Sequence, residues 1–281
     1  MKGDITINRK WAAIALAGTL VALSVVELIG VASATSYPQP PAKVGVATNS
    51  ALPASVKNAK FVNQNGTPET LGALKGKTVF VVPFLTLCGD TCPFTTGNLL
   101  QLRSRLNAAK AASVEVVAIS VDPYRDTEAR IAAYAKIIGA NFQIWTETGP
   151  TTTPYITDKE FASKNPIGKG DKNAYLTALE KFLGWTVQVV PQSVPAPTDW
   201  MAPDDLLSYD INHSDGFWII DANQSVRFAS GDLPAFTGTL SNVLSTFMGY
   251  KSNIYNSPVY KGGWTPPEAL QAIEWVANER L

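Results

Sequence analysis

Residues 79–93 read VFVVPFLTLCGDTCP, an apolar run followed by a short loop with two cysteines. The run over 79–85 is short and rich in β-branched and aromatic residues, which is typical of a strand buried on both faces. Pro93 favours the first turn of a helix, where its missing N–H costs nothing. We therefore expect strand, cysteine loop and helix in that order. Pro83 removes a ladder donor, so we also expect a bulge or an unpaired edge there.

The sequence that follows predicts a βαβ unit. A helix over 95–112 leads to a strand over 114–121 and then to a helix over 126–138, whose N-terminus Asp126 or Thr127 can cap. The two strands should be parallel, with a right-handed crossover. Functional groups of such sheets collect beyond the carboxyl ends of the strands, and the cysteine loop lies there.

Two hairpins flank this unit. The turn Asn65-Gly66 predicts one before it, and the stretches 217–220 and 226–229 predict one after it, followed by a helix over 236–247. Hairpin, βαβ unit, helix and closing ββα is the element order of a thioredoxin-like domain. We therefore expect an α/β thioredoxin-like fold with a central mixed sheet flanked by helices. An insertion precedes its closing hairpin, and a helical extension follows it.

The N-terminus predicts export. Basic residues at positions 2, 9 and 10 precede an uncharged apolar run over 11–26, and small residues close the segment at 32–34. This layout is typical of a signal peptide. An uncleaved anchor is the alternative, because the apolar character resumes after the run and a membrane-spanning helix needs about 20 residues. We expect the protein to be extracytoplasmic, either periplasmic or on the outer face of the cell membrane.

We divide the chain into four parts. Residues 1–34 form the signal peptide or membrane anchor, and 35–58, rich in Pro, Ala, Ser and Thr, form a flexible linker. The thioredoxin-like domain covers 59–248, with the insertion at 149–205. The C-terminal extension over 249–281 ends in an amphipathic helix that we expect to pack on the domain. Because the extension is aromatic, docking to a partner is the alternative.

Composition excludes several classes of protein. With 23 Lys+Arg and 23 Asp+Glu, the formal net charge is zero, so the chain lacks the positive field typical of nucleic-acid-binding proteins. Two cysteines cannot form a disulfide-stapled scaffold, and one histidine cannot form a multi-histidine metal site. Any soft-metal or thiol chemistry must therefore use Cys88, Cys92 and His213.

The spacing of Cys88 and Cys92 leaves several functions open. A structural disulfide across so short a loop would stabilise the fold by only about 2 kcal/mol. Two thiolates and one imidazole suit Cu(I) best and Zn(II) next. A helix N-terminus lowers the pKa of a thiol, which also suits a thiol–disulfide oxidoreductase. A peroxidase is less favoured, because we can place no Arg or Gln/Trp donors near Cys88.

His213 lies just before the first strand of the closing hairpin. A single histidine is more often a surface or hydrogen-bonded residue than a metal ligand. In a thioredoxin-like sheet, however, the closing hairpin runs beside the cysteine loop. The expected fold therefore brings His213 toward Cys88 and Cys92, and we interpret it as a ligand.

Three blocks carry a family resemblance. They are TLCGDTCP over 86–93, SVDPYRDT over 120–127, and the His-Ser pair at 213–214. Together they resemble the signature blocks of the Sco/SenC copper proteins. The resemblance covers 61–148 and 209–248, and the combination of blocks is more specific than any one of them.

The resemblance implies a membrane-tethered or exported domain that binds copper, as Cu(I) or Cu(II), through Cys88, Cys92 and His213. Asp122 matches an acidic position of the family near the site, although Asp-Pro is also a common turn opener. Sco/SenC proteins are metallochaperones that help assemble the binuclear copper centre of cytochrome c oxidase subunit II. They deliver copper to that centre, or to another copper-receiving protein, or they reduce its cysteines.

Overall fold

The structure is a computed structural model. It describes residues 39–147, 179, 181–192, 194–207, 209–236, 240–247 and 262–278. The predicted signal peptide or anchor over 1–34 and much of the predicted insertion lie outside the described residues. Within the described part of the chain, no helix has the length and apolar character needed to span a membrane.

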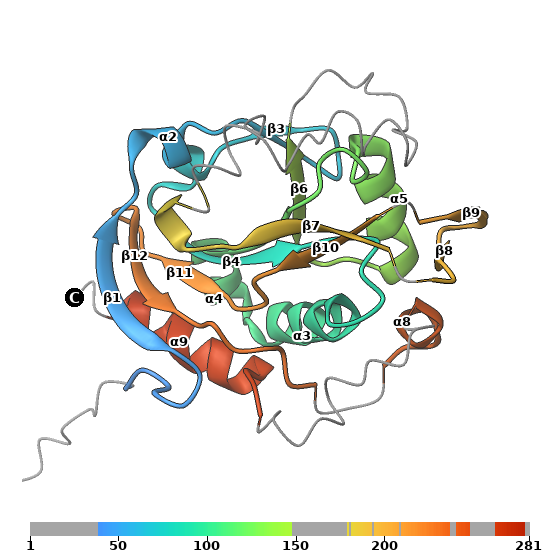
Figure 1. Ribbon diagram of the computed structural model, residues 1–281. Helices are drawn as coiled ribbons and strands as arrows, with labels where there is room; N and C mark the ends of the chain where they lie inside the picture. The colour runs from blue at the N-terminus through green and yellow to red at the C-terminus, as the bar shows by residue number, and fades with distance from the viewer. Residues whose placement is uncertain are drawn as a thin grey trace, which may run out of the picture. The chain divides into compact units, whose positions relative to one another are not determined.

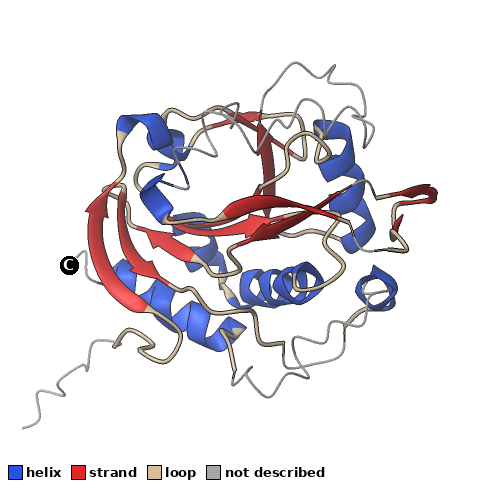
Figure 2. Cartoon of the chain, in the orientation of Figure 1, coloured by secondary structure: helices blue, strands red, loops and turns tan. Residues whose placement is uncertain are grey.

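A mixed sheet organises the described residues (Figure 1, Figure 2). Its strand order is β1-β12-β11-β4-β5-β6-β2-β3. The strands are β1 (Val46–Ala51), β2 (Phe61–Asn63), β3 (Pro68–Glu69), β4 (Thr78–Phe84), β5 (Val114–Ser120), β6 (Gln143–Glu147), β11 (Trp218–Ile220) and β12 (Ser225–Ala229). The three strands β4, β5 and β6 run parallel. β11 pairs antiparallel with β4, β12 pairs antiparallel with β11, and β2 pairs antiparallel with β6. This mixed α/β arrangement confirms the predicted thioredoxin-like fold.

Helices connect and cover the sheet. They are α2 (Ala54–Lys57), α3 (Cys92–Arg105), α4 (Ala108–Ser113), α5 (Glu128–Ile138), α8 (Asn242–Phe247) and α9 (Pro266–Asn278), with a 3-10 turn at η1 (Leu71–Leu74). From β4 through α3 to β5, and from β5 through α5 to β6, the chain moves in the same direction across the sheet. Right-handed crossovers then place α3 and α5 on the same face. A hydrogen bond of 2.8 Å between Thr96 of α3 and Tyr134 of α5 agrees with this placement.

The strand that leads to the cysteine loop is buried along its whole length. Pro83 stands opposite Ile119 in an unbroken parallel register, so no bulge forms against β5. On the other side, β11 pairs only with Val79–Val81 of β4. Pro83 therefore lies beyond the register with β11, where its missing donor interrupts no pairing with that strand.

Several helix boundaries differ from the expected ones, and α8, expected over 236–247, begins at Asn242. The helix predicted over 95–112 is divided into α3 and α4, because the side chain of Asn107 accepts a hydrogen bond from the backbone N–H of Lys110 at 3.0 Å and caps a new helix. At α5, the cap is Thr127, whose hydroxyl accepts from the N–H of Arg130 at 3.3 Å. Asp126, the other candidate for this cap, has a different role, described below.

The segment predicted as a flexible linker over 35–58 is folded in its described part. β1 pairs antiparallel with β12, and Leu52 donates its N–H to the carbonyl oxygen of Gln224 at 2.8 Å. Leu52 and Val56 are both buried. The apolar residues among the Pro, Ala and Ser of this segment are enough to extend the sheet along the free edge of β12. The linker prediction is corrected for this stretch.

The predicted insertion and extension both contribute structure. The described part of 149–205 contains β7 (Val187–Pro191), β8 (Thr198–Asp199) and most of β9 (Ala202–Leu206). β7 pairs antiparallel with β10 (Tyr209–His213), and β8 pairs with β9. In the extension, α9 contacts α3, β4 and β11. Its apolar face is buried on the domain, as we expect from the sequence.

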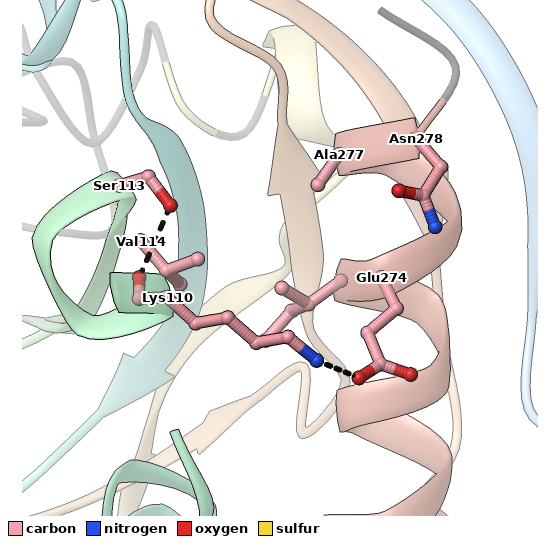
Figure 3. Close-up of a pocket in the computed structure, with 7 residues that line it drawn as sticks. Lys110, Ser113, Val114, Glu274, Ala277 and Asn278 are labelled. Carbon is pink, nitrogen blue, oxygen red and sulfur yellow. Dashed lines mark hydrogen bonds and ion pairs between the residues drawn. The ribbon is translucent and has the colours of Figure 1, made fainter. Parts of the chain in front are cut away.

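A pocket of about 390 Å³ lies between α4 and α9 (Figure 3). Lys110 of α4 and Glu274 of α9 form an ion pair at its wall. The pocket is not lined by any of the predicted metal ligands. We therefore regard it as a gap between two packed helices.

Replacing Ile273 with alanine tests the packing of α9. This side chain is 1% exposed, so its truncation should lower the free energy of unfolding by about 2–4 kcal/mol in a urea titration. The matched control is Gln271→Ala, on the exposed face of the same helix, which removes only a solvent-exposed hydrogen bond to the carbonyl oxygen of Gln39 and should change stability by about 1 kcal/mol at most. Equal effects of the two substitutions would show that α9 does not pack as described.

Candidate metal centre

The two cysteines flank the junction between strand and helix. Cys88 lies in the loop after β4 and is partly exposed, whereas Cys92 is the first residue of α3 and is 1% exposed. Both thiols are free. The first backbone N–H groups of a helix have no partner within it and favour negative charge. The location therefore suits a thiolate.

His213 is the last residue of β10. Pairing with Val187 of β7 places it there, and its Nε2 lies 3.8 Å from the Sγ of Cys92. The two Sγ atoms and a ring nitrogen of His213 lie within 4.8 Å of one another. The structure thus brings together all three side chains that the sequence singled out. Metal binding by them remains a prediction.

A backbone contact sets the tautomer of His213. Its Nδ1 lies 2.7 Å from the carbonyl oxygen of Ser214, and a carbonyl oxygen can only accept, so Nδ1 carries a proton and donates it. In the neutral ring the lone pair is then on Nε2, the atom that faces Cys92. Such a contact is the usual way in which a protein orients an imidazole ligand.

The environment gives the two thiols opposite acidities. A hydrogen bond from Cys92 holds the pKa of the Cys88 thiol well below its usual value, and the charge of His213 adds to this effect. Burial raises the pKa of Cys92 well above its usual value, and the neighbouring Cys88 adds to that effect. Before a metal binds, Cys88 is therefore the thiolate and Cys92 the protonated thiol.

His213 is the cation of this cluster. Burial opposes the charged ring, but the hydrogen bond with Cys88 and the negative charges of Asp215 and Cys88 outweigh it and raise the pKa of His213 to about 9. At neutral pH the site therefore contains a thiolate and imidazolium pair. A metal ion that binds Nε2 must displace a proton from it.

Thr91 and Asp215 join the two halves of the site. The hydroxyl of Thr91 donates to Oδ1 of Asp215 at 2.7 Å, and it lies 3.9 Å from the Sγ of Cys88. Burial raises the pKa of Asp215, although the charge of His213 and the bond from Thr91 oppose the rise. Neither residue was assigned a role from the sequence. Their positions could have indicated one, since Thr91 lies three residues after Cys88 and Asp215 lies two residues after His213.

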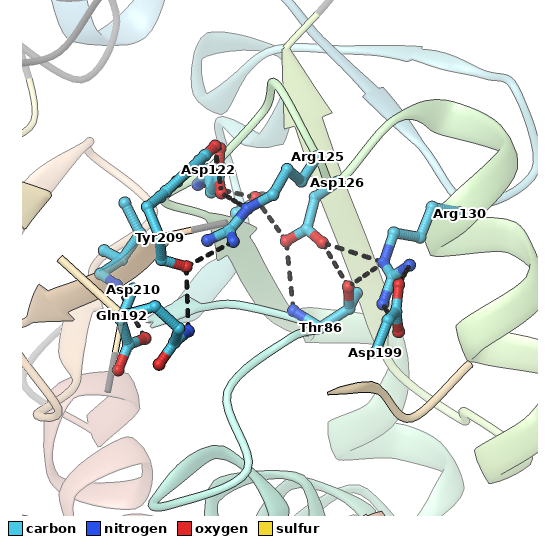
Figure 4. Close-up of polar contacts among 11 residues, drawn as sticks. Thr86, Asp122, Arg125, Asp126, Arg130, Gln192, Asp199, Tyr209 and Asp210 are labelled. Carbon is cyan, nitrogen blue, oxygen red and sulfur yellow. Dashed lines mark hydrogen bonds and ion pairs between the residues drawn. The ribbon is translucent and has the colours of Figure 1, made fainter. Parts of the chain in front are cut away.

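Asp122 lies in a buried polar cluster (Figure 4). It forms an ion pair with Arg125 and accepts hydrogen bonds of 3.0 Å from the hydroxyl of Tyr209. No contact joins its side chain to the three predicted ligands among the described residues. Asp122 also organises the turn before α5, because its carbonyl oxygen accepts from the N–H of Asp126 at 2.8 Å. Its hydrogen bonds to the Tyr209 hydroxyl connect it to β10, the strand in which Tyr209 lies four residues before His213.

Asp126 holds the start of the cysteine loop. It accepts hydrogen bonds from the N–H of Thr86 at 3.2 Å and from the hydroxyl of Ser120 at 2.7 Å. Arg130 lies 3.8 Å from the same carboxylate. Burial raises the pKa of Asp126 to about 6, although Arg130 and these hydrogen bonds oppose the rise. The sequence suggested only a helix cap here, because a buried carboxylate cannot be distinguished from an exposed one by its position in the chain.

Comparison with known proteins finds a family match in the part of the chain that carries the two cysteines. Residues 50–164 match the SCO1/SenC family model. The resemblance drawn from the cysteine and aspartate blocks is confirmed by this match. His213 lies beyond the matched residues, so the SCO1/SenC region itself supplies the two thiols, and the fold adds the imidazole.

Two curated relatives agree with the family match. A putative copper-binding protein of Stutzerimonas stutzeri is 30% identical over 88 residues, which are 31% of this chain and 43% of the relative. The SCO1 protein homolog of Bacillus subtilis is 31% identical over 86 residues, which are 30% of this chain and 44% of the relative. The chain therefore spans less than half the length of the curated relatives it matches.

Solved structures show similarity at lower identity. ScoI of Bradyrhizobium japonicum with copper bound is 17% identical, with a TM-score of 0.46, and the match covers 82% of this chain and 99% of that one. Apo Sco1 of Thermus thermophilus is 15% identical, with a TM-score of 0.47, covering 87% of this chain and 98% of that one.

The unequal thiols give a first chemical test. Cys88 should react with iodoacetamide at pH 7 at least about ten times faster than Cys92, because the thiolate is the nucleophile and Cys88 is the more accessible. Mass spectrometry of peptides measures both rates. In a His213→Gln variant the pKa of Cys88 should rise, so its alkylation rate should fall as the pH is lowered from 9 to 7. Equal rates for the two cysteines would contradict the assignment.

Proposed function

We propose that this protein is a copper metallochaperone that holds its cargo through Cys88, Cys92 and His213. The observation that carries the proposal is the group of two Sγ atoms and one ring nitrogen within 4.8 Å of one another. Two thiolates and an imidazole, without a carboxylate in the group, suit Cu(I) first and Zn(II) next. The names of the curated relatives, a copper-binding protein and a SCO1 homolog, favour copper.

The distances fit a single ion. Bonds of about 2.0–2.3 Å from nitrogen and sulfur to one trigonal ion leave neighbouring ligand atoms about 4 Å apart. Nε2 of His213 and Sγ of Cys92 are already 3.8 Å apart, and none of the three atoms lies farther than 4.8 Å from another. A shift of less than about 1 Å in the cysteine loop would bring all three ligand atoms onto one ion. The site therefore needs little rearrangement to bind.

Binding of the ion releases protons from the site. Cys88 is already a thiolate, whereas Cys92 and His213 are protonated at neutral pH and must each release a proton when they bind. Two thiolates around Cu(I) leave one net negative charge, which the N-terminus of α3 stabilises. Transfer to a partner reverses the sequence, because the protons return to Cys92 and His213 as the ion leaves. The protein is then a carrier, and no bond in a substrate is broken.

Thiol–disulfide exchange is the second candidate. The unequal thiols favour it, since the more exposed Cys88 is suited to attack and the buried Cys92 to resolve. The Cys88 thiolate would attack a partner disulfide and release one partner thiolate. Cys92 would then lose its proton and attack the Cys88 sulfur, releasing the second partner thiolate. The partner gains two electrons, and the protein ends with a Cys88–Cys92 disulfide.

We further propose the binuclear copper centre of cytochrome c oxidase subunit II, or another copper-receiving protein, as the partner. The resemblance to the Sco/SenC family supports this proposal, together with the SCO1/SenC match over 50–164. An extracytoplasmic location, tethered or exported, follows from the basic, apolar and small-residue order of the first 34 residues.

Copper loading tests the ligand set. The reduced protein should bind one Cu(I). Cys88→Ala, Cys92→Ala or His213→Ala should each lower the Cu(I) affinity by more than about 100-fold, because losing a direct ligand weakens binding more than losing a residue that only orients a ligand. Competition with a chromogenic chelator measures the affinity. Loading with Cu(II) should give a thiolate-to-copper absorption band that changes in His213→Ala. The control is Asn212→Ala, beside His213 but exposed, and a wild-type protein that takes up no copper would refute the proposal.

Copper affinity should rise with pH. Below pH 9, His213 and Cys92 carry protons that binding must displace, so each higher pH unit favours binding by up to about 100-fold, tenfold for each proton. Competition titrations at pH 6, 7 and 8, corrected for the chelator's own protonation, measure the slope. A flat profile for the wild type would contradict the proton release.

A further inference from the structure

We propose that Asp199 and Trp200, in the predicted insertion, are positioning residues that hold the Cys88 loop in the geometry that binds metal. Asp199 ends β8 and Trp200 follows it. Neither lies in the region that matches the SCO1/SenC family model. The inference rests on the proposed copper function and extends it to a part of the chain that the ligands alone leave without a role.

The contacts converge on Thr86, two residues before Cys88. Thr86 is fully buried, and each of its polar groups has a partner. Its N–H donates to Asp126 at 3.2 Å, and its hydroxyl also donates to Asp126. The same hydroxyl accepts from Nε of Arg130 at 2.6 Å, and its carbonyl oxygen accepts from the indole Nε1 of Trp200 at 2.7 Å. Thr86 cannot move without breaking bonds to three other residues.

Asp199 fixes the guanidinium that reaches Thr86 (Figure 4). Nη1 and Nη2 of Arg130 donate to its two carboxylate oxygens at 2.6 and 2.9 Å, which is the strong bidentate arrangement. Asp199 also accepts the N–H of Met201 at 2.9 Å, so the carboxylate is itself oriented by the turn after β8. The insertion therefore contacts Thr86 directly through Trp200 and indirectly through Arg130.

The same segment touches the elements that carry the other two ligands. The Trp200 ring packs edge-on against Tyr134 with centroids 5.7 Å apart, and the Tyr134 hydroxyl bonds to Thr96 of α3, the helix that begins at Cys92. β7 begins twelve residues before Asp199. It pairs with β10, the strand that ends at His213. The stretch 187–200 thus reaches the supports of all three proposed ligands.

The physical consequence is preorganisation. A three-residue site is weakened if one ligand must be ordered when the ion arrives, because that ordering lowers the net affinity. Cys88 is the ligand at risk, since it lies in a loop, whereas Cys92 is held by a helix and His213 by a strand pair. Fixing Thr86 shortens the free part of this loop to the residues between Thr86 and Cys92.

Trp200→Phe is the sharpest test. It removes the indole N–H that bonds to Thr86 but keeps an aromatic ring beside Tyr134. We expect the Cu(I) affinity to fall about tenfold and the Cu(II) absorption band to shift, as for the loss of an outer support of a metal site. In the metal-free protein, amide hydrogen exchange over 86–92 should become faster. Asp199→Asn, which weakens the bidentate pair, should act in the same direction.

The matched control is Trp145→Phe. Trp145 is fully buried in β6, and its indole N–H has no hydrogen-bond partner among the described residues, so this variant loses the same atoms without losing a bond to the cysteine loop. It should keep the wild-type band and affinity. Wild-type copper affinity and spectrum in both Trp200→Phe and Asp199→Asn would overturn the inference. If the wild type itself binds no copper, the proposed function fails. The positioning role is tested separately in the metal-free protein, where unchanged amide hydrogen exchange over 86–92 in Trp200→Phe would overturn it.

Discussion

The parallel pairing of β4 with β5 determines where the chemistry of this protein occurs. The register runs unbroken from Thr78 opposite Val114 to Phe84 opposite Ser120. Both strands therefore end at the same edge of the sheet, and the cysteine loop and the Asp122 turn leave it side by side. Asp126 can then accept from Thr86 and Ser120, one at the end of each strand. Without this common edge, the polar cluster and the thiols would belong to separate parts of the molecule.

The charged groups of the site face partners of opposite charge. A thiolate at Cys88 and the carboxylate of Asp215 both act on the imidazolium of His213, while Cys92 stays neutral because it is buried. Farther along the same edge, Arg125 neutralises Asp122, and Arg130 lies between Asp126 and Asp199. Buried charges are tolerated when each has a partner, and every one of these carboxylates faces a guanidinium. These carboxylates are therefore buried in pairs with arginines.

Much of this could be predicted from the sequence. The apolar run over 79–85, the cysteine loop and the hairpin at 217–229 gave the order of elements, and that order placed His213 near the thiols because topology is fixed by few rules. The remainder depends on contacts between distant residues. The bond from Trp200 to Thr86 spans 114 positions and the bond from Tyr209 to Asp122 spans 87, and no local pattern encodes either. The edge strand β1 was missed for a related reason: it contains little alternation, and only its pairing with β12 makes it a strand.

The contact between Cys92 and His213 closes a loop of 121 residues. Closing such a loop costs chain entropy, which the packing of β10 on the domain must offset. Until β10 has joined the domain, a chain that already has its two cysteines offers any soft ion only two thiols and no imidazole. The three proposed ligands are therefore together only in molecules that have folded, and the long span between Cys92 and His213 separates folded from unfolded copies of the protein.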